Sequence, residues 1–171
     1  TMTYDQFAQT SKTYRFQKAF NDFFQGMQYD GIDEGAAEAL NVIFKKNNHS
    51  ISIDNLSTGE KQVVFRGAYL LRNSKTLEGG TVLIDEPELS MHPKWQEKIF
   101  EYYRGLFNRN NIQTVQMILA THSENVVRAA LKDSDNVLVI ILNNENGVVK
   151  ADKINDRVLP TIIIVTSNYK C

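Results

Sequence analysis

The sequence predicts an α/β fold in which a mostly parallel sheet is flanked by helices. Short apolar runs at residues 81–85, 115–120 and 137–142 have the length and composition of buried strands. Segments with apolar residues at helical spacing separate these runs, at residues 94–107 and 124–131. Strands that alternate with helices in this way are typical of parallel sheets, because parallel strands need long crossover connections.

Residues 4–27 carry aromatic side chains at roughly helical spacing and contain no proline, which indicates one or two amphipathic helices. A core-facing helix explains this pattern, although the aromatic side chains could instead form a surface that packs on another part of the protein. Residues 29–35 are rich in Gly and Asp and are expected to form a turn. Two short runs at residues 39–45 and 50–54, separated by an Asn-Asn pair, predict a β-hairpin.

A helix is expected from Ser57 to about Arg72. Ser57 and Glu60 have the Ser-x-x-Glu spacing of a capping box, in which each side chain bonds the backbone N–H of the other residue. Ser123 stands in the N-cap position of the helix expected at residues 124–131. Both helices therefore begin at residues that can satisfy the free N–H groups of their first turns.

The composition is that of an ordinary globular domain, with 42% hydrophobic and 23% charged residues. A net charge of −1 gives no general attraction to nucleic acid or to an acidic membrane. A single cysteine, Cys171, excludes a disulfide framework and fits a reducing cytoplasm. No apolar run approaches the roughly 20 residues of a membrane helix, and no secretory signal is visible. We therefore expect a cytoplasmic protein with no membrane partner.

The strongest chemical signal is the pair of acids at the end of the apolar run at residues 81–85. In open parallel sheets, ligands bind beyond the carboxyl ends of the strands. Asp85 at that edge can hold Mg²⁺ beside phosphate oxygens, and Glu86 can orient and deprotonate an attacking water. Taken alone, the same pattern also fits a strand that ends in a polar turn.

Two further signals suit phosphate chemistry. The helix that begins at Ser57 offers free backbone N–H groups and the positive end of its dipole, and Gly59 permits close backbone approach. His122 follows the second apolar run and can donate a hydrogen bond to a phosphate oxygen or to a water. Each signal has a simpler alternative, which is an ordinary helix cap for Ser57 and a surface histidine for His122.

Four segments, in order, resemble the C-terminal half of an ABC-type ATPase head. Residues 56–62 resemble the ABC signature, 82–86 the Walker B strand with its following glutamate, 87–93 the D-loop and 120–123 the switch-histidine loop. The run Asp-Glu-Pro-Glu-Leu-Ser-Met-His-Pro is similar to that of OLD-like, SMC- and RecF-related soluble ATPases rather than membrane transporters. The resemblance covers about residues 50–150 and implies a partial P-loop NTPase head with an N-terminal helical segment.

The resemblance also implies a role for each residue in the strand-end loops. It assigns Mg²⁺ to Asp85, the general base to Glu86 and sensing of the γ-phosphate to His122. Glu88 and His92 match the family pattern as well, but the sequence gives them no separate chemical role. ATP and Mg²⁺ are therefore the expected cofactors.

In this family two heads dimerise head-to-tail with ATP between them. Ser57 and Gly59 of the signature would reach the nucleotide on the partner head. Glu60 of the same signature is also expected to be a nucleotide-binding residue. Ser90 in the D-loop would lie at the dimer seam. The resemblance therefore implies a second ATPase head, in a homodimer, as the main partner.

One part of the family head is missing from this sequence. It contains no Gly-x-x-x-x-Gly-Lys-Ser/Thr loop, the Walker A motif, and no Gly-Lys pair at all. Residues 1–50 are expected to be a helical segment and the start of a hairpin, 51–158 the C-terminal lobe of the head, and 159–171 the truncated start of a following segment. Both ends look cut, so we expect that the Walker A lobe was removed, with its location on another chain as the alternative. The isolated chain is expected to be inactive.

The expected function is an ATP-driven dimerisation switch in DNA repair, chromosome handling or phage defence, with DNA or a nuclease as a further partner. This expectation rests on the family resemblance. One alternative is a non-catalytic protein-interaction module, which the retained Asp85, Glu86 and His122 disfavour. The other is the ATPase subunit of a membrane transporter, which the amino-acid sequence of the D-loop disfavours.

Overall fold

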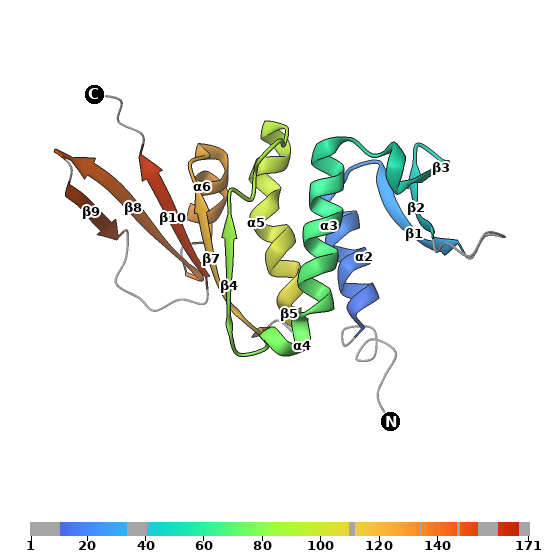
Figure 1. Cartoon of the computed structure of the whole chain (residues 1–171), viewed down its shortest axis with the longest axis horizontal. Coiled ribbons are helices and arrows are strands. Elements are labelled where there is room, and N and C mark those ends of the chain that lie inside the picture. Colours follow the sequence, from blue (N-terminus) through green and yellow to red (C-terminus); the bar gives the residue numbers. More distant parts are fainter. Residues whose placement is uncertain are drawn as a thin grey trace.

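The computed structural model describes residues 11–33, 41–109, 112–133, 135–146, 148–153 and 161–167. Its helices are α2 (Lys12–Phe23), α3 (Thr58–Arg72), α4 (Ser74–Leu77), α5 (Pro93–Phe107) and α6 (Glu124–Leu131), with a 3₁₀ turn, η1 (Ile53–Asn55). Its strands are β1 (Met27–Asp33), β2 (Asn41–Lys46), β3 (His49–Ser52), β4 (Thr81–Asp85), β5 (Asn108–Arg109), β6 (Ile112–Gln113), β7 (Gln116–Thr121), β8 (Val137–Glu145), β9 (Val148–Lys153) and β10 (Thr161–Ser167). Figure 1 shows these elements coloured along the chain.

The main sheet has five strands in the order β4-β7-β10-β8-β9. Strands β4, β7, β10 and β8 are parallel, and β9 is antiparallel to β8. Helix α5 connects β4 to β7 and α6 connects β7 to β8, so helices supply the crossovers that parallel strands need. The predicted α/β fold, a mostly parallel sheet flanked by helices, is confirmed (Figure 1).

Strand β10 corrects the domain boundary expected near the C-terminal end. Residues 159–171 are expected from the sequence to begin a following segment, but Thr161–Ser167 lies inside the main sheet, between β7 and β8. Ile163 is fully buried there. A central parallel strand and the start of an appended segment are equally compatible with a short Ile/Val run, because sequence order does not reveal strand order.

Helices cover one face of the sheet where β4 forms its edge. Val82 and Ile84 of β4 are buried, whereas Thr81, Leu83 and Asp85 are exposed, as the alternation of a strand requires. Helices α2, α3 and α5 contact one another, and α5 also contacts α6. Figure 1 shows α2, α3 and α5 grouped beside β4. With Leu83 74% exposed, the other face of the sheet is open at β4.

Helix α2 is the amphipathic helix predicted within residues 4–27, of which residues 4–10 lie outside the described part of the chain. Its side chains Phe20 and Phe23 are buried, and the ring of Phe23 lies 5.4 Å from that of Tyr102 on α5. The aromatic pattern therefore reflects a helix that faces the core. Burial of each Phe side chain stabilises the fold by roughly 1.5–3 kcal/mol.

A second, antiparallel sheet in the order β1-β2-β3 precedes α3. The turn expected at residues 29–35 is wrong for residues 29–33, which belong to β1. The register of β1 against β2 shifts at Gly31, whose φ of +126° suits a bulge, so the Gly-rich composition marks a bulge and not a turn. The predicted β2–β3 hairpin is confirmed, with Asn47 and Asn48 both in the left-handed conformation.

Candidate functional site

The carboxyl ends of β4 and β7 meet at one edge of the main sheet. The two strands are parallel neighbours, and Asp85 pairs with Ala120 at their ends. The backbone N–H of Glu86 donates to the Ala120 carbonyl at 2.9 Å, which extends the pairing one residue beyond β4. The loops that follow the two strands therefore leave the sheet side by side, at the edge where open parallel sheets bind ligands.

The structure brings the side chains of Glu86 and His122 together. Glu86 Oε1 lies 2.8 Å from His122 Nδ1, and the two side chains are 30% and 57% exposed. A carboxylate at Nδ1 favours a proton on that nitrogen, so Nε2 is left for a ligand: it accepts from a water in the neutral ring and donates to a phosphate oxygen when both nitrogens carry protons. This pair can therefore exchange a proton with a bound water or orient it, and a ligand can reach both groups.

Glu86 has a left-handed backbone, with φ of 46°. This conformation costs a non-glycine residue roughly 1–2 kcal/mol, so neighbouring groups must stabilise it. Arg66 on α3 does so directly, because its Nη1 donates to the Glu86 carbonyl at 3.0 Å. Ser90 in the same loop is also left-handed, with φ of 63°. Helix α3 thus helps to position the loop that carries Glu86.

Glu88 links the two loops of the site from below the surface. It is 4% exposed, and its Oε1 accepts a hydrogen bond from Thr121 Oγ1 at 2.5 Å. The Thr121 hydroxyl in turn accepts from the backbone N–H of Ser123 at 3.0 Å. Because His122 lies between these two residues, Glu88 helps to set the backbone on which the imidazole is mounted.

One cluster in the described part of the chain could share a cation. The ligand atoms of Glu86, Glu88 and His122 lie within 4.8 Å of one another. Asp85, to which the resemblance assigns Mg²⁺, is exposed at the end of β4 and is not part of this cluster. Carboxylate oxygens are ligands that Mg²⁺ prefers, whereas imidazole suits softer metals. The acids present therefore fit Mg²⁺ chemistry, with Asp85 placed apart from the Glu86–His122 pair.

The predicted capping box at the start of α3 is confirmed. Glu60 Oε2 accepts from the Ser57 N–H at 2.7 Å, and Ser57 Oγ accepts from the Glu60 N–H at 3.4 Å. Lys46 Nζ bonds the other carboxylate oxygen of Glu60 at 2.8 Å. Burial raises the pKa of Glu60, but the hydrogen bonds from Lys46 and Ser57 outweigh it and leave the pKa below its ordinary value. Since both of its oxygens are engaged, Glu60 contributes by holding Ser57, whose side chain is exposed.

Gly59 and Ser90, both predicted site residues, lie against each other in one chain. A Cβ added at Gly59 would stand 2.8 Å from the Ser90 carbonyl oxygen and 3.4 Å from the Trp95 ring. A side chain at this position would therefore displace the loop that follows β4. Figure 1 shows the first turn of α3 and the loop after β4 at the same end of the molecule, at the top of the view.

The sequence interpretation assigned no role to Arg66 or Glu88. Both side chains act on the hydroxyl of Tyr103 on α5. Burial raises the pKa of Tyr103, Arg66 lowers this pKa and Glu88 raises it further. Glu88 could have been found from its position in the D-loop run. Arg66 lies in the middle of α3, outside every motif, so only the packing of α3 against the loop reveals it.

One protein family matches most of the chain. The family described as "AAA domain, putative AbiEii toxin, Type IV TA system" matches residues 4–128, which include the first turn of α3, the acids after β4 and His122. The chain belongs to this family. All of the residues predicted for the site lie inside the segment that matches the AAA-domain family.

Curated relatives of this AAA domain are bacterial proteins. The chain is 36% identical over 110 residues to the Retron Ec83 probable ATPase of Escherichia coli, covering 59% of this chain and 19% of that protein. It is 33% identical over 108 residues to the Retron Vc95 probable ATPase of Vibrio cholerae serotype O1 biovar El Tor, covering 58% and 20%. It is 27% identical over 105 residues to Septu protein PtuA of Bacillus thuringiensis, covering 55% and 25%. The matched part of this chain thus spans a fifth to a quarter of these relatives.

The fold of the AAA domain is similar to that of a solved SMC ATPase chain, from work described as "Structural biochemistry of ATP-driven dimerization and DNA stimulated activation of SMC ATPases". The TM-score is 0.62 at 15% identity, and the match covers 88% of each chain. At this identity the match shows the shared fold alone. Among the described residues, no helix is long and apolar enough to cross a membrane.

Proposed function

We propose that this AAA domain is the signature-bearing half of a composite ATPase site, completed by a Walker A lobe and a second head. The observation that carries the proposal is the 2.8 Å contact between Glu86 and His122 at the carboxyl edge of a parallel sheet. A strand-end carboxylate hydrogen-bonded to an imidazole is suited to positioning and deprotonating a water beside a phosphate. The two curated relatives named as probable ATPases support this chemistry.

In the proposed site Glu86 is the general base, and His122 contacts the γ-phosphate. Asp85 supports Mg²⁺ through its exposed carboxylate at the end of β4. Bound Mg²⁺ would neutralise phosphate charge, which is the main contribution a metal makes to phosphoryl transfer. Arg66 and Glu88 are positioning residues, because they hold the backbones of Glu86 and His122 and are not themselves proposed to touch the nucleotide.

The first turn of α3 would serve the nucleotide of the partner head. Ser57 is exposed, and the hydroxyl hydrogen that its capping bond leaves unused could face the partner head, while Glu60 fixes the cap. Ser90, packed against Gly59, would lie at the seam of a head-to-tail homodimer. Hydrolysis would then require closure of two heads, because each head supplies groups that the other lacks.

We propose that the Walker A lobe lies elsewhere in the complete protein or on another chain. The sequence contains no Gly-Lys pair, so a P-loop lysine must come from outside these residues. The open face of the sheet beside Asp85, where Leu83 is 74% exposed, offers an apolar surface for such a lobe. The proposed assembly belongs to the OLD-like, SMC- and RecF-related soluble group. Residues 51–158 together with β10 would form its C-terminal lobe.

Phage defence is the setting we favour among those that the sequence predicts. The family description names a toxin of a type IV toxin–antitoxin system, and relatives carry retron and Septu names. DNA or a nuclease remains the expected further partner, and the cytoplasm the expected location. Neither a passive interaction module nor a transporter subunit gains support from a particular contact in the structure.

The first test is MgATP hydrolysis by the 171-residue chain alone, with Glu86→Gln as the control. We expect no turnover above the control, because the sequence contains no Walker A loop to hold the phosphates. Turnover that disappears in Glu86→Gln would overturn the half-site proposal, since a cradle would then have to exist within these residues. A colorimetric phosphate assay measures the outcome.

The second test restores a Walker A lobe, either from the full-length protein or added in trans. We expect ATP-dependent dimers by light scattering, and Glu86→Gln should trap them by blocking hydrolysis. In a passive interaction module, Glu86→Gln would leave the oligomeric state independent of ATP. That result would contradict the proposed switch.

A further inference from the structure

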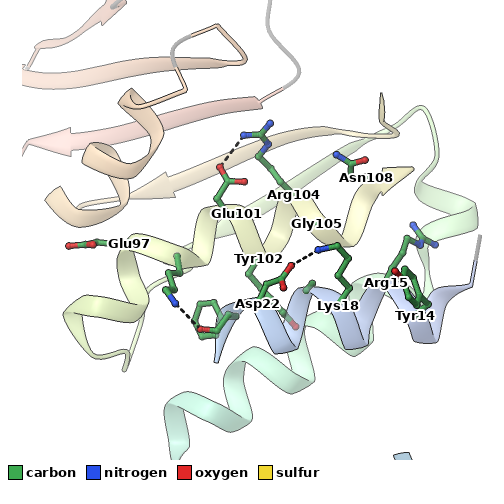
Figure 2. A pocket seen from close by; sticks show the side chains of 13 residues that line it. Tyr14, Arg15, Lys18, Asp22, Glu97, Glu101, Tyr102, Arg104, Gly105 and Asn108 are labelled. Atoms are coloured by element: carbon green, nitrogen blue, oxygen red, sulfur yellow. Dashed lines mark hydrogen bonds and ion pairs between the residues drawn. The ribbon is translucent and has the colours of Figure 1, made fainter. Parts of the chain in front are cut away.

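A cavity of about 490 Å³ lies between α2 and α5 (Figure 2). This volume is within the range of roughly 300–1,000 Å³ that is typical of small-molecule sites. Of the described residues that line the cavity, none belongs to the candidate ATPase site. Binding of a ligand in this cavity would therefore be independent of the proposed ATPase function.

Most of the charges around the cavity are already paired. Lys18 Nζ lies 2.6 Å from Asp22 Oδ2, one turn further along α2. Arg104 bonds Glu101 at 3.1 Å and also forms an ion pair with Asp133. Figure 2 shows Lys18, Asp22, Glu101 and Arg104 around the groove between the two helices. Their mutual pairing leaves little net charge to attract a ligand from the walls alone.

Arg15 differs from the other charged residues described around the cavity because it alone is buried. It lines the cavity and is only 5% exposed. In the part of the chain that the structure describes, its guanidinium makes one hydrogen bond, from Nη1 to the Leu106 carbonyl at 2.9 Å. Its Nε is buried and has no hydrogen-bond partner among these residues. With Nη1 engaged and Nε out of reach of solvent, Nη2 is the donor left to bond an oxygen of a carboxylate or phosphate.

The electrostatic surroundings of Arg15 would also favour a nearby anion. Burial lowers the pKa of Arg15, the positive charge of Arg109 lowers it further, and Glu78 opposes them. Glu78 is itself bonded to Arg109, whose Nη1 lies 3.2 Å from the Glu78 carboxylate. Arg15 forms no ion pair with another described residue; a buried guanidinium without a counter-ion is unfavourable, and a bound anion would relieve that cost.

We propose that this cavity binds a small ligand through an oxoanion group, held by Nη2 of Arg15. The body of the ligand would contact the aromatic and aliphatic part of the lining, which includes Tyr14, Ala19 and Tyr102. Lys18 stands one helical turn from Arg15 on the same face of α2, at the rim, and its charge, which Asp22 partly offsets, lies near the proposed anion. Phosphate and carboxylate share the chemistry that the Arg15 donor recognises.

The test is a titration of the ¹⁵N-labelled chain, followed by the arginine Nε–H resonances in NMR spectra. Inorganic phosphate, phenyl phosphate and benzoate are the probes. We expect a saturable shift of the Arg15 signal and a higher midpoint of thermal unfolding with at least one probe. Stronger binding of phenyl phosphate than inorganic phosphate would indicate an organic phosphate, the reverse would indicate the free anion, and preference for benzoate would indicate a carboxylate. An Arg15 signal that stays unmoved up to about 10 mM of every probe would overturn the proposal.

A matched pair of variants distinguishes a specific anion site from general attraction of anions to the protein surface. Lys18→Glu reverses an exposed charge at the rim and leaves Arg15 in place, so folding should survive. Arg128→Glu breaks a comparable exposed pair, with Glu124 on α6, outside the cavity lining. We expect Lys18→Glu to weaken binding several-fold and Arg128→Glu to leave it unchanged. Equal effects of both variants, or none, would show an adventitious ion only and would contradict the proposed site.

Discussion

Glu86 is held in a conformation that it would not adopt alone. Its φ of 46° is unfavourable for an L-residue with a side chain, and two hydrogen bonds offset this cost. Its N–H bonds the Ala120 carbonyl, and its carbonyl accepts from Arg66 on α3. The carboxylate that faces His122 is therefore aimed by its backbone as much as by the imidazole.

Arg66→Gln tests this positioning role. We expect the free energy of unfolding to fall by about 1–2 kcal/mol, because a hydrogen bond from a charged donor is lost and the Glu86 carbonyl loses its partner. Urea unfolding of the isolated chain measures the change. Arg72→Gln is the matched control, since Arg72 lies on the same helix with an exposed side chain and should shift the value by less than about 0.5 kcal/mol. Equal losses in the two variants would show that Arg66 acts only through helix propensity.

At the scale of the element, α3 depends on its capping box. The pKa of Glu60 lies below its ordinary value because the folded chain supplies Lys46 and the Ser57 N–H as partners of the carboxylate. A carboxyl group with a lowered pKa in the folded state stabilises the fold above its unfolded pKa. That stability is lost as the pH falls through the folded pKa.

Glu60→Gln should therefore destabilise the chain in a pH-dependent way. Near neutral pH we expect a loss of about 1 kcal/mol, since the amide can keep the cap but cannot pair with Lys46, which is half exposed. The difference from the wild type should shrink as the pH falls below the ordinary value of 4.5. Urea midpoints between neutral pH and pH 3 measure it, and Glu124→Gln, at an 86% exposed side chain, is the control. A difference independent of pH would contradict the assigned ion pair.

At the scale of the whole molecule, β10 joins the two halves of the main sheet. It pairs with β7 on one side and with β8 on the other, and Ile163 is fully buried. Without β10, the β4–β7 pair and the β8–β9 pair would not be hydrogen-bonded to each other. A segment near the end of the chain is thus central to the fold.

Ile163→Ala should lower the free energy of unfolding by about 2–4 kcal/mol, because a fully buried side chain leaves a cavity. Ile112→Ala, at a side chain that is 68% exposed, is the same substitution without burial and should cost much less. Thermal unfolding of both variants measures the comparison. If Ile163→Ala behaved like Ile112→Ala, residues 161–167 would be a peripheral segment, as the sequence alone suggests.

The sequence by itself determined much of the local structure and indicated an ATPase-related family. The capping box of α3, the Asn47–Asn48 hairpin and the strand–helix alternation depend on residues a few positions apart, so their spacing is readable in the chain. The same spacing placed Glu86 and His122 at one edge, because carboxyl ends of neighbouring parallel strands meet. Only the tertiary structure decided the insertion of β10, the contact of Arg66 with the Glu86 backbone and the burial of Arg15. These three features depend on which distant elements pack together. Burial of side chains across the whole core decides that packing, so it leaves no local pattern in the sequence.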